Sequence, residues 1–172
     1  MARLKKLTAF TFIELVIAVG LMAIISLFIA GGLNNLRNIS RRVSRKQLVK
    51  NEGDHILEVI TRMARSGRPL DCSSDQYFTI INPDGGLSRF LFKNNSIASR
   101  SAPLGEDIDS STQEETLNDS QVKVTEFHLD CSHFIPHSWG NWLKLKFKLE
   151  DTLKPSDPIE MNFESGISFR NR

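Results

Sequence analysis

The sequence predicts an α+β protein in which a long N-terminal helix packs on an antiparallel β-rich head. Two observations predict this class. Residues 10–33 are almost entirely apolar, and a helical spacing of apolar side chains continues beyond them to about Ser66. From Gln76 onward the apolar residues alternate with polar ones, which is typical of strands that bury one face.

Residues 10–33 are long enough to cross a membrane as a helix. At a rise of about 1.5 Å per residue they extend about 36 Å, and the hydrocarbon core of a bilayer is about 30 Å thick. A single carboxylate, Glu14, lies near the start of this run. Because an acid inside a membrane span is costly and usually functional, we expect Glu14 to have a positively charged partner.

The segment from Lys5 to Leu15 carries a second pattern. Basic residues precede the small residue Ala9, and Phe-Thr-x-x-Glu, ending at Glu14, then opens the apolar helix. This pattern resembles the leader of type IV pilins and pseudopilins, most of which have Gly where this chain has Ala9. The resemblance implies that a prepilin peptidase cleaves after Ala9 and methylates the new amino terminus at Phe10. It also implies that Glu14 pairs with the terminal amine of a neighbouring subunit.

The same resemblance implies an organisation and a function. The expected segments are a leader (1–9), a transmembrane helix (10–33), an amphipathic continuation of that helix (34–68) and an extracytoplasmic head (69–172). The expected function is that of a minor pilin or pseudopilin in a type IV pilus or a type II secretion filament, with other pilins, the peptidase and the membrane as partners. Such filaments act in adhesion, DNA uptake or secretion. The chain would reside first in the cytoplasmic membrane and then in the filament.

Two other interpretations of the apolar run stay open. A secretory signal peptide also begins with basic residues, and Ala30-Gly31-Gly32 could serve as its cleavage site, but its apolar core usually has only about 7–15 residues. The second interpretation is a plain membrane anchor that carries an extracytoplasmic binding domain and does not assemble into a filament. Basic residues flank both ends of the run, so the positive-inside rule does not orient the chain.

The helical pattern continues past the span. Leu36, Ile39 and Val43 recur at spacings of three and four residues, and a second set, Ile56, Ile60 and Met63, resumes the pattern. Gly67 and the Arg68-Pro69 pair predict the end of the helix. The only weak positions for a helix inside it are glycines: Gly20, Gly31, Gly32 and Gly53. Gly31 and Gly32 are interpreted either as a hinge or as small residues that allow close helix packing.

Charge is distributed unevenly along the chain. Residues 1–70 carry a net charge of +8 and residues 71–172 a net charge of −6. The basic segment, residues 37–50, contains six Lys or Arg and no acid. Its expected partners are anionic lipid headgroups or acidic faces of neighbouring subunits. Nucleic acid is an alternative partner, although no aromatic residue is interleaved to stack on bases.

The head should be an antiparallel meander. Residues 77–81 and 87–93 are expected to form a hairpin around the turn at residues 83–86, and Asn94-Asn95 should turn the chain again. Residues 100–121 are rich in Ser and acids and are expected to form a surface loop. Further strands are expected at 122–129, 142–150, 159–164 and 167–169. Alternating Lys and Glu should face one another across the 142–150 and 159–164 strands.

Two cysteines, Cys72 and Cys131, suggest one disulfide if the head lies outside the cytoplasm. Zinc is the alternative, because His128, His133 and His137 lie close to Cys131 in the sequence. Our prediction is the disulfide and no metal site. The sequence contains no nucleophile elbow, phosphate-binding loop or zinc-protease motif, so we expect neither catalytic residues nor a cofactor.

Overall fold

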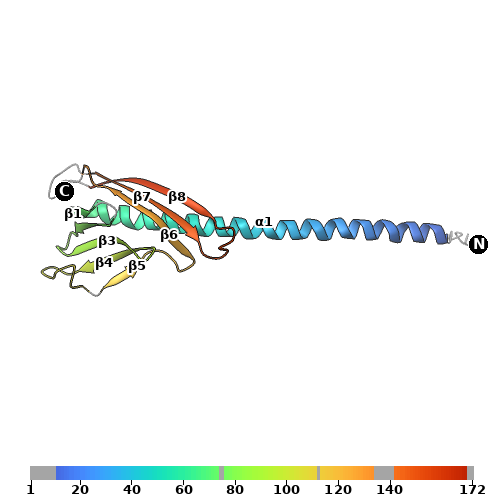
Figure 1. Ribbon diagram of the computed structural model, residues 1–172, viewed down its shortest axis with the longest axis horizontal. Helices are drawn as coiled ribbons and strands as arrows, with labels where there is room; N and C mark the ends of the chain where they lie inside the picture. The colour runs from blue at the N-terminus through green and yellow to red at the C-terminus, as the bar shows by residue number, and fades with distance from the viewer. Residues whose placement is uncertain (1–10, 74–75, 112, 134–141, 170–172) are drawn as a thin grey trace, which may run out of the picture. The chain divides into compact units, whose positions relative to one another are not determined.

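The computed structural model describes residues 11–73, 76–111, 113–133 and 142–169. Helix α1 spans Phe12–Ser66. The strands are β1 (Arg68–Ser73), β2 (Tyr77–Ile81), β3 (Leu87–Lys93), β4 (Ser96–Ala102), β5 (Glu114–Thr116), β6 (Val122–Asp130), β7 (Trp142–Asp151) and β8 (Glu160–Ser168). One helix followed by antiparallel strands confirms the α+β class (Figure 1). The chain divides into two compact units, one ending at Ser44 and the other beginning at Arg45.

The described part of the first unit is a single helical segment. Its apolar side chains are exposed throughout, which leaves them available to lipid or to another protein. The helix is long and apolar enough near the N-terminus to cross a membrane once. It continues without interruption through Gly31 and Gly32, so those glycines do not break the helix.

The second unit packs the remainder of α1 against two sheets. The first sheet has the order β1-β2-β3-β4-β5 and the second the order β6-β7-β8, and all pairings are antiparallel. The strands therefore form two separate antiparallel meanders, where a single one was expected. A backbone hydrogen bond from Val124 N–H to the Asn95 carbonyl, 2.7 Å long, joins them.

The core of the second unit lies between α1 and both sheets. Ile56 and Ile60 are fully buried there and Met63 packs against them, so the apolar face of this half of the helix contacts the sheets as expected. Gly53 is also buried, and a Cβ at this position would lie only 2.1 Å from the ring of Phe163 in β8. The glycine thus permits close approach of the helix to β8.

The helix ends where the sequence predicts, at Ser66, with Gly67 N–H bonding to the Met63 carbonyl at 3.0 Å. The expected helical segment to residue 68 was two residues too long, because Arg68 already belongs to β1. Strand β1 was not predicted from the sequence. Its residues have no clear alternation, and the strand exists because its backbone pairs with β2.

The hairpin turns follow the expected chemistry. Gly85 has a positive φ of 85° in the turn between β2 and β3, and Asn94 and Asn95 have φ values of 50° and 59° between β3 and β4. Two adjacent residues with positive φ form the tight turn that matches the twist of a hairpin.

Two expectations about the head were wrong in detail. Residues 100–121 are not one surface loop, because 100–102 end β4 and β5 pairs with β4 at its edge. Ile108 within this segment is buried, and so is Asn118, whose side chain binds Ile97 N–H and the Val122 carbonyl. The two expected strands at 159–164 and 167–169 are one strand, β8, that runs through Gly166.

The expected Lys–Glu pairs do occur between β7 and β8. Lys146 is directly opposite Glu164, and Lys144 and Lys148 approach Glu164 and Glu160 to 2.6 and 2.7 Å. These pairs lie on the solvent side of the second sheet, where water screens the charges and each pair contributes little to stability.

Candidate functional site

The candidate assembly site is the first turn of α1. Thr11 directly precedes the helix, and Glu14 is the third helical residue. The Thr11 N–H donates to Glu14 Oε2 at 2.9 Å, the Thr11 hydroxyl contacts the same oxygen at 3.0 Å, and the Glu14 N–H approaches Thr11 Oγ1 at 3.4 Å. These reciprocal contacts form a capping box, which satisfies backbone N–H groups that a helix start leaves unpaired.

The capping box gives Glu14 a partner within its own chain. A positively charged partner was expected for Glu14, and within the described residues no basic side chain forms an ion pair with it. The Thr-x-x-Glu spacing was the signal that could have identified Thr11 as the capping residue. The carboxylate still lies in an exposed apolar surface, next to side chains such as Phe12 and Ile13.

The predicted cleavage site, Ala9 and Phe10, lies outside the described residues. Thr11 therefore marks the start of the described chain, one residue after the predicted new terminus.

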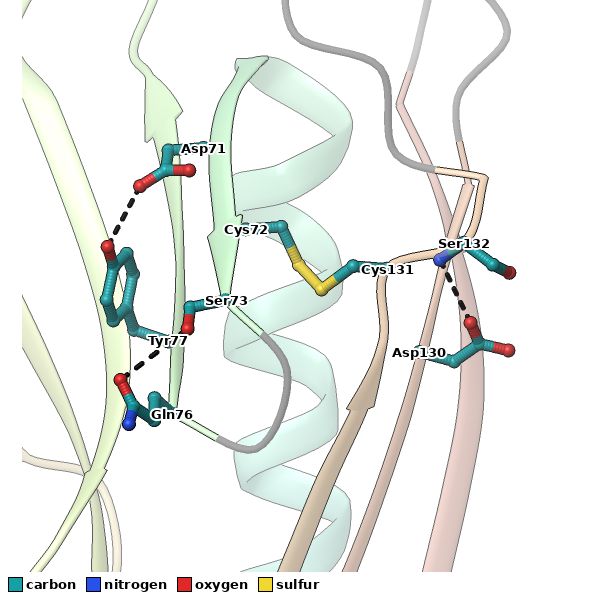
Figure 2. The surroundings of a disulfide bond; sticks show 8 residues. All are labelled: Asp71, Cys72, Ser73, Gln76, Tyr77, Asp130, Cys131 and Ser132. Atoms are coloured by element: carbon teal, nitrogen blue, oxygen red, sulfur yellow. Dashed lines mark hydrogen bonds between the residues drawn. A yellow bond between two sulfur atoms is a disulfide. The ribbon is translucent and has the colours of Figure 1, made fainter.

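The two cysteines form the predicted disulfide. Cys72 lies in β1 and Cys131 directly follows β6, with their Cα atoms 6.1 Å apart (Figure 2). The bond connects the two sheets across 59 residues of sequence. Cys72 belongs to β1, which was not predicted from the sequence, so the bond links this strand to the end of β6. Because Cys131 is in a disulfide, its thiolate cannot serve as a zinc ligand.

The described residues contain no group of three or more His, Cys, Asp or Glu side chains that could hold a metal ion. His128 and His133 are described, and His133 stacks on Trp142 with ring centroids 4.3 Å apart. His137 lies outside the described residues.

Polar contacts flank the disulfide on both sides. The Tyr77 hydroxyl donates to Asp71 at 3.0 Å, and this bond raises the pKa of Tyr77 (Figure 2). On the other side, Ser132 N–H donates to Asp130 at 3.0 Å. Hydrogen bonds from Ser132 lower the pKa of the Asp130 carboxyl. The first contact joins side chains of β1 and β2, and the second spans Cys131.

An open groove of about 1010 Å³ lies between the C-terminal part of α1 and the turn that joins β2 to β3. Apolar side chains, including Leu57, Ile81 and Pro83, form part of its wall. Arg62, Arg65 and Arg68 line it as well. Because Asp54 and Glu58 line the groove too, it combines an apolar wall with charged groups of both signs, a composition suited to binding a peptide or a small molecule.

The basic segment is helical, and most of its cations are exposed. Arg45 differs from the others, because its guanidinium binds the buried carboxylate of Asp151. The remaining cations of the segment are Arg37, Arg41, Arg42, Lys46 and Lys50.

Comparison of the chain with protein-family models, with characterised proteins and with solved structures found no match.

Proposed function

We propose that this protein is a structural subunit of a pilin-like filament, of the minor pilin or pseudopilin type. The observation that carries the proposal is the start of α1. There Glu14 lies in the first turn of α1. The part of α1 that belongs to the first unit exposes an apolar surface long enough to cross a membrane. An apolar helix of this kind serves as a membrane anchor before assembly and packs against other helices afterwards.

The second unit suits the role of a head carried by that helix. It has its own core, and the disulfide between Cys72 and Cys131 favours an oxidising compartment outside the cytoplasm. In the proposed function, a prepilin peptidase cleaves after Ala9, methylates Phe10 and releases a mature chain whose fifth residue is Glu14.

The capping box adds a feature to this proposal. Cleavage after Ala9 would leave Thr11 as the second residue of the mature chain, so the capping contacts survive processing. Only one Glu14 oxygen, Oε2, takes part in them. The other oxygen is free of these contacts and can accept a hydrogen bond from the terminal amine of a neighbouring subunit.

Processing provides the direct test. Mass spectrometry of the protein isolated from its native membrane should show loss of residues 1–9 and a methylated Phe10. Ala9→Leu should leave a full-length precursor, because the peptidase pattern requires a small residue there, whereas Ala9→Gly should be processed at least as well as the wild type. Cleavage of Ala9→Leu at Phe10 would contradict the leader assignment.

The second candidate function is a membrane-anchored binding domain that does not assemble. The groove between α1 and the β2–β3 turn favours it, because an open groove with apolar and charged walls can hold a ligand without any filament. An uncut chain that retains Met1 in the membrane would support this candidate over the filament subunit.

A further inference from the structure

Three arginines lie just beyond the apolar part of α1. They are Arg37, Arg41 and Arg42, all exposed and all within the first compact unit. In the described part of the chain none of them forms an ion pair with a carboxylate. Arg45, by contrast, is engaged by Asp151 and is not available to another partner.

Their distance from the span follows from helix geometry. Because α1 is continuous from Phe12 to Ser66, each residue adds about 1.5 Å along the axis. Arg37 is therefore about 6 Å beyond Leu33, and Arg41 and Arg42 are about 12–14 Å beyond it. The headgroup layer of a bilayer extends about 5–8 Å from the hydrocarbon edge.

The direction of the side chains shortens these distances. Side chains in an α-helix tilt toward its N-terminus, which here is the direction of the membrane span. An extended arginine that reaches back by about 6 Å brings the guanidinium of Arg41 or Arg42 to the headgroup layer. All three guanidinium groups can therefore reach the headgroup layer.

The three arginines also share one side of the helix. At about 100° per residue they occupy an arc of about 140°. The apolar residues of the same stretch, Leu36, Ile39 and Val43, are exposed and centred about 160° away, on the opposite side. An apolar stripe is the better surface for a neighbouring helix, so packing through it leaves the arginines facing lipid.

We propose that Arg37, Arg41 and Arg42 form a binding site for the phosphate groups of anionic phospholipids at the membrane surface. The planar guanidinium fork matches phosphate oxygens, and each such cation near an anionic surface contributes favourably to binding. The site requires the membrane span but not assembly into a filament. A negative result for this site would therefore leave the proposed function unaffected, and the reverse also holds.

The test uses the full chain reconstituted in phosphatidylcholine bilayers that contain either spin-labelled phosphatidylglycerol or spin-labelled phosphatidylcholine. Electron paramagnetic resonance measures how strongly each labelled lipid associates with the protein. We expect phosphatidylglycerol to be preferred by about ten-fold at low salt and by much less at high salt. The triple variant R37Q/R41Q/R42Q should lose this preference, and R37K/R41K/R42K should keep most of it.

A matched pair of double variants controls for charge alone. R37Q/R41Q should lower the preference, whereas K46Q/K50Q, which removes two exposed cations that lie further along the same helix and outside the proposed site, should not. Equal loss in both double variants, or an unchanged preference in the triple variant, would overturn the proposal. A triple variant that keeps the lipid preference but no longer binds duplex DNA, or a second copy of the chain, would also overturn the proposal. That result would assign the arginines to the lost partner.

Discussion

The guanidinium of Arg45 and the carboxylate of Asp151 form a buried ion pair between α1 and the end of β7. Arg45 Nε binds one oxygen of Asp151, and Nη2 donates to the other at 2.9 Å and to the Asp157 carbonyl at 2.6 Å. The Ile159 N–H donates to the same carboxylate at 2.8 Å. The pair thus ties the first helical turn of the second unit to the β7–β8 connection.

Removing one member of this pair should destabilise the second unit. Arg45→Gln leaves the fully buried Asp151 carboxylate with one backbone donor and no countercharge. An uncompensated buried charge strongly lowers the free energy of unfolding. The matched control is Arg62→Gln, which breaks the exposed Arg62–Glu58 pair on the same helix. Urea unfolding should show a clearly larger loss for Arg45→Gln. Equal losses would mean that the pair contributes no more than a surface contact.

The same pair predicts a pH dependence. Hydrogen bonding by Arg45 lowers the pKa of Asp151 below its usual value, and the Ile159 N–H acts in the same direction, while burial opposes them. Because the folded pKa is the lower one, the resulting stability is fully present above the ordinary carboxyl pKa of about 4 and is lost as pH falls toward the folded value.

Asp151→Asn isolates this contribution, because the carboxyls of Asp130, Glu114 and Glu164 also have lowered pKa values. The difference in unfolding free energy between wild type and Asp151→Asn should shrink as pH is lowered from about 6 to about 3. A difference that stays constant over this range would show that the carboxylate charge is not what stabilises the contact.

Gly53→Ala should destabilise the head although alanine favours helices. The new methyl group would lie 2.1 Å from the Phe163 ring, so the ring or the helix must move. Overpacking of this kind costs about 1–3 kcal/mol and exceeds the gain in helix propensity of up to about 1 kcal/mol. Gly166→Ala is the control, since a Cβ there meets nothing within 4 Å. Thermal unfolding that ranks the two variants in the opposite order would contradict the packing of α1 on β8.

Cys72→Ser and Cys131→Ser should lower stability by similar amounts, about 2–4 kcal/mol, and the double variant should be no worse than either. All three break the same bond between the two sheets. Denaturant unfolding under oxidising conditions measures the losses. Two thiols that react in the unreduced, denatured wild type would exclude the disulfide.

Glu14→Gln separates the capping contacts of Glu14 from its proposed role in assembly. Glutamine can replace glutamate in a capping box, but it carries no charge to pair with an amine. If the charge is needed for assembly, Glu14→Gln and Glu14→Ala should both insert in the membrane and both be poorly incorporated into filaments. If only the cap matters, Glu14→Gln should be incorporated normally and Thr11→Ala should share the defect of Glu14→Ala. Quantifying subunits in sheared filaments distinguishes these outcomes.

Local patterns in the sequence determined the elements with strong periodicity. The helix end at Ser66, the hairpin turns at Gly85 and Asn94-Asn95, and the Lys–Glu pairs of β7 and β8 all follow from short-range rules of spacing and backbone conformation. The pairing of Cys72 with Cys131 could be predicted from the sequence because the chain has only two cysteines.

Only the tertiary structure decided the features that depend on a distant partner. β1 and β5 lack a side-chain pattern and form because their backbones complete the hydrogen bonds of β2 and β4. In the sequence Gly53 is only a weak point in the helix, and its role is clear only from the position of Phe163 next to it. Arg45 likewise resembles the other basic residues in the sequence, and only the structure shows its contact with Asp151, 106 positions later. Periodicity records which face of an element is buried, and it carries no information about which residue will cover that face.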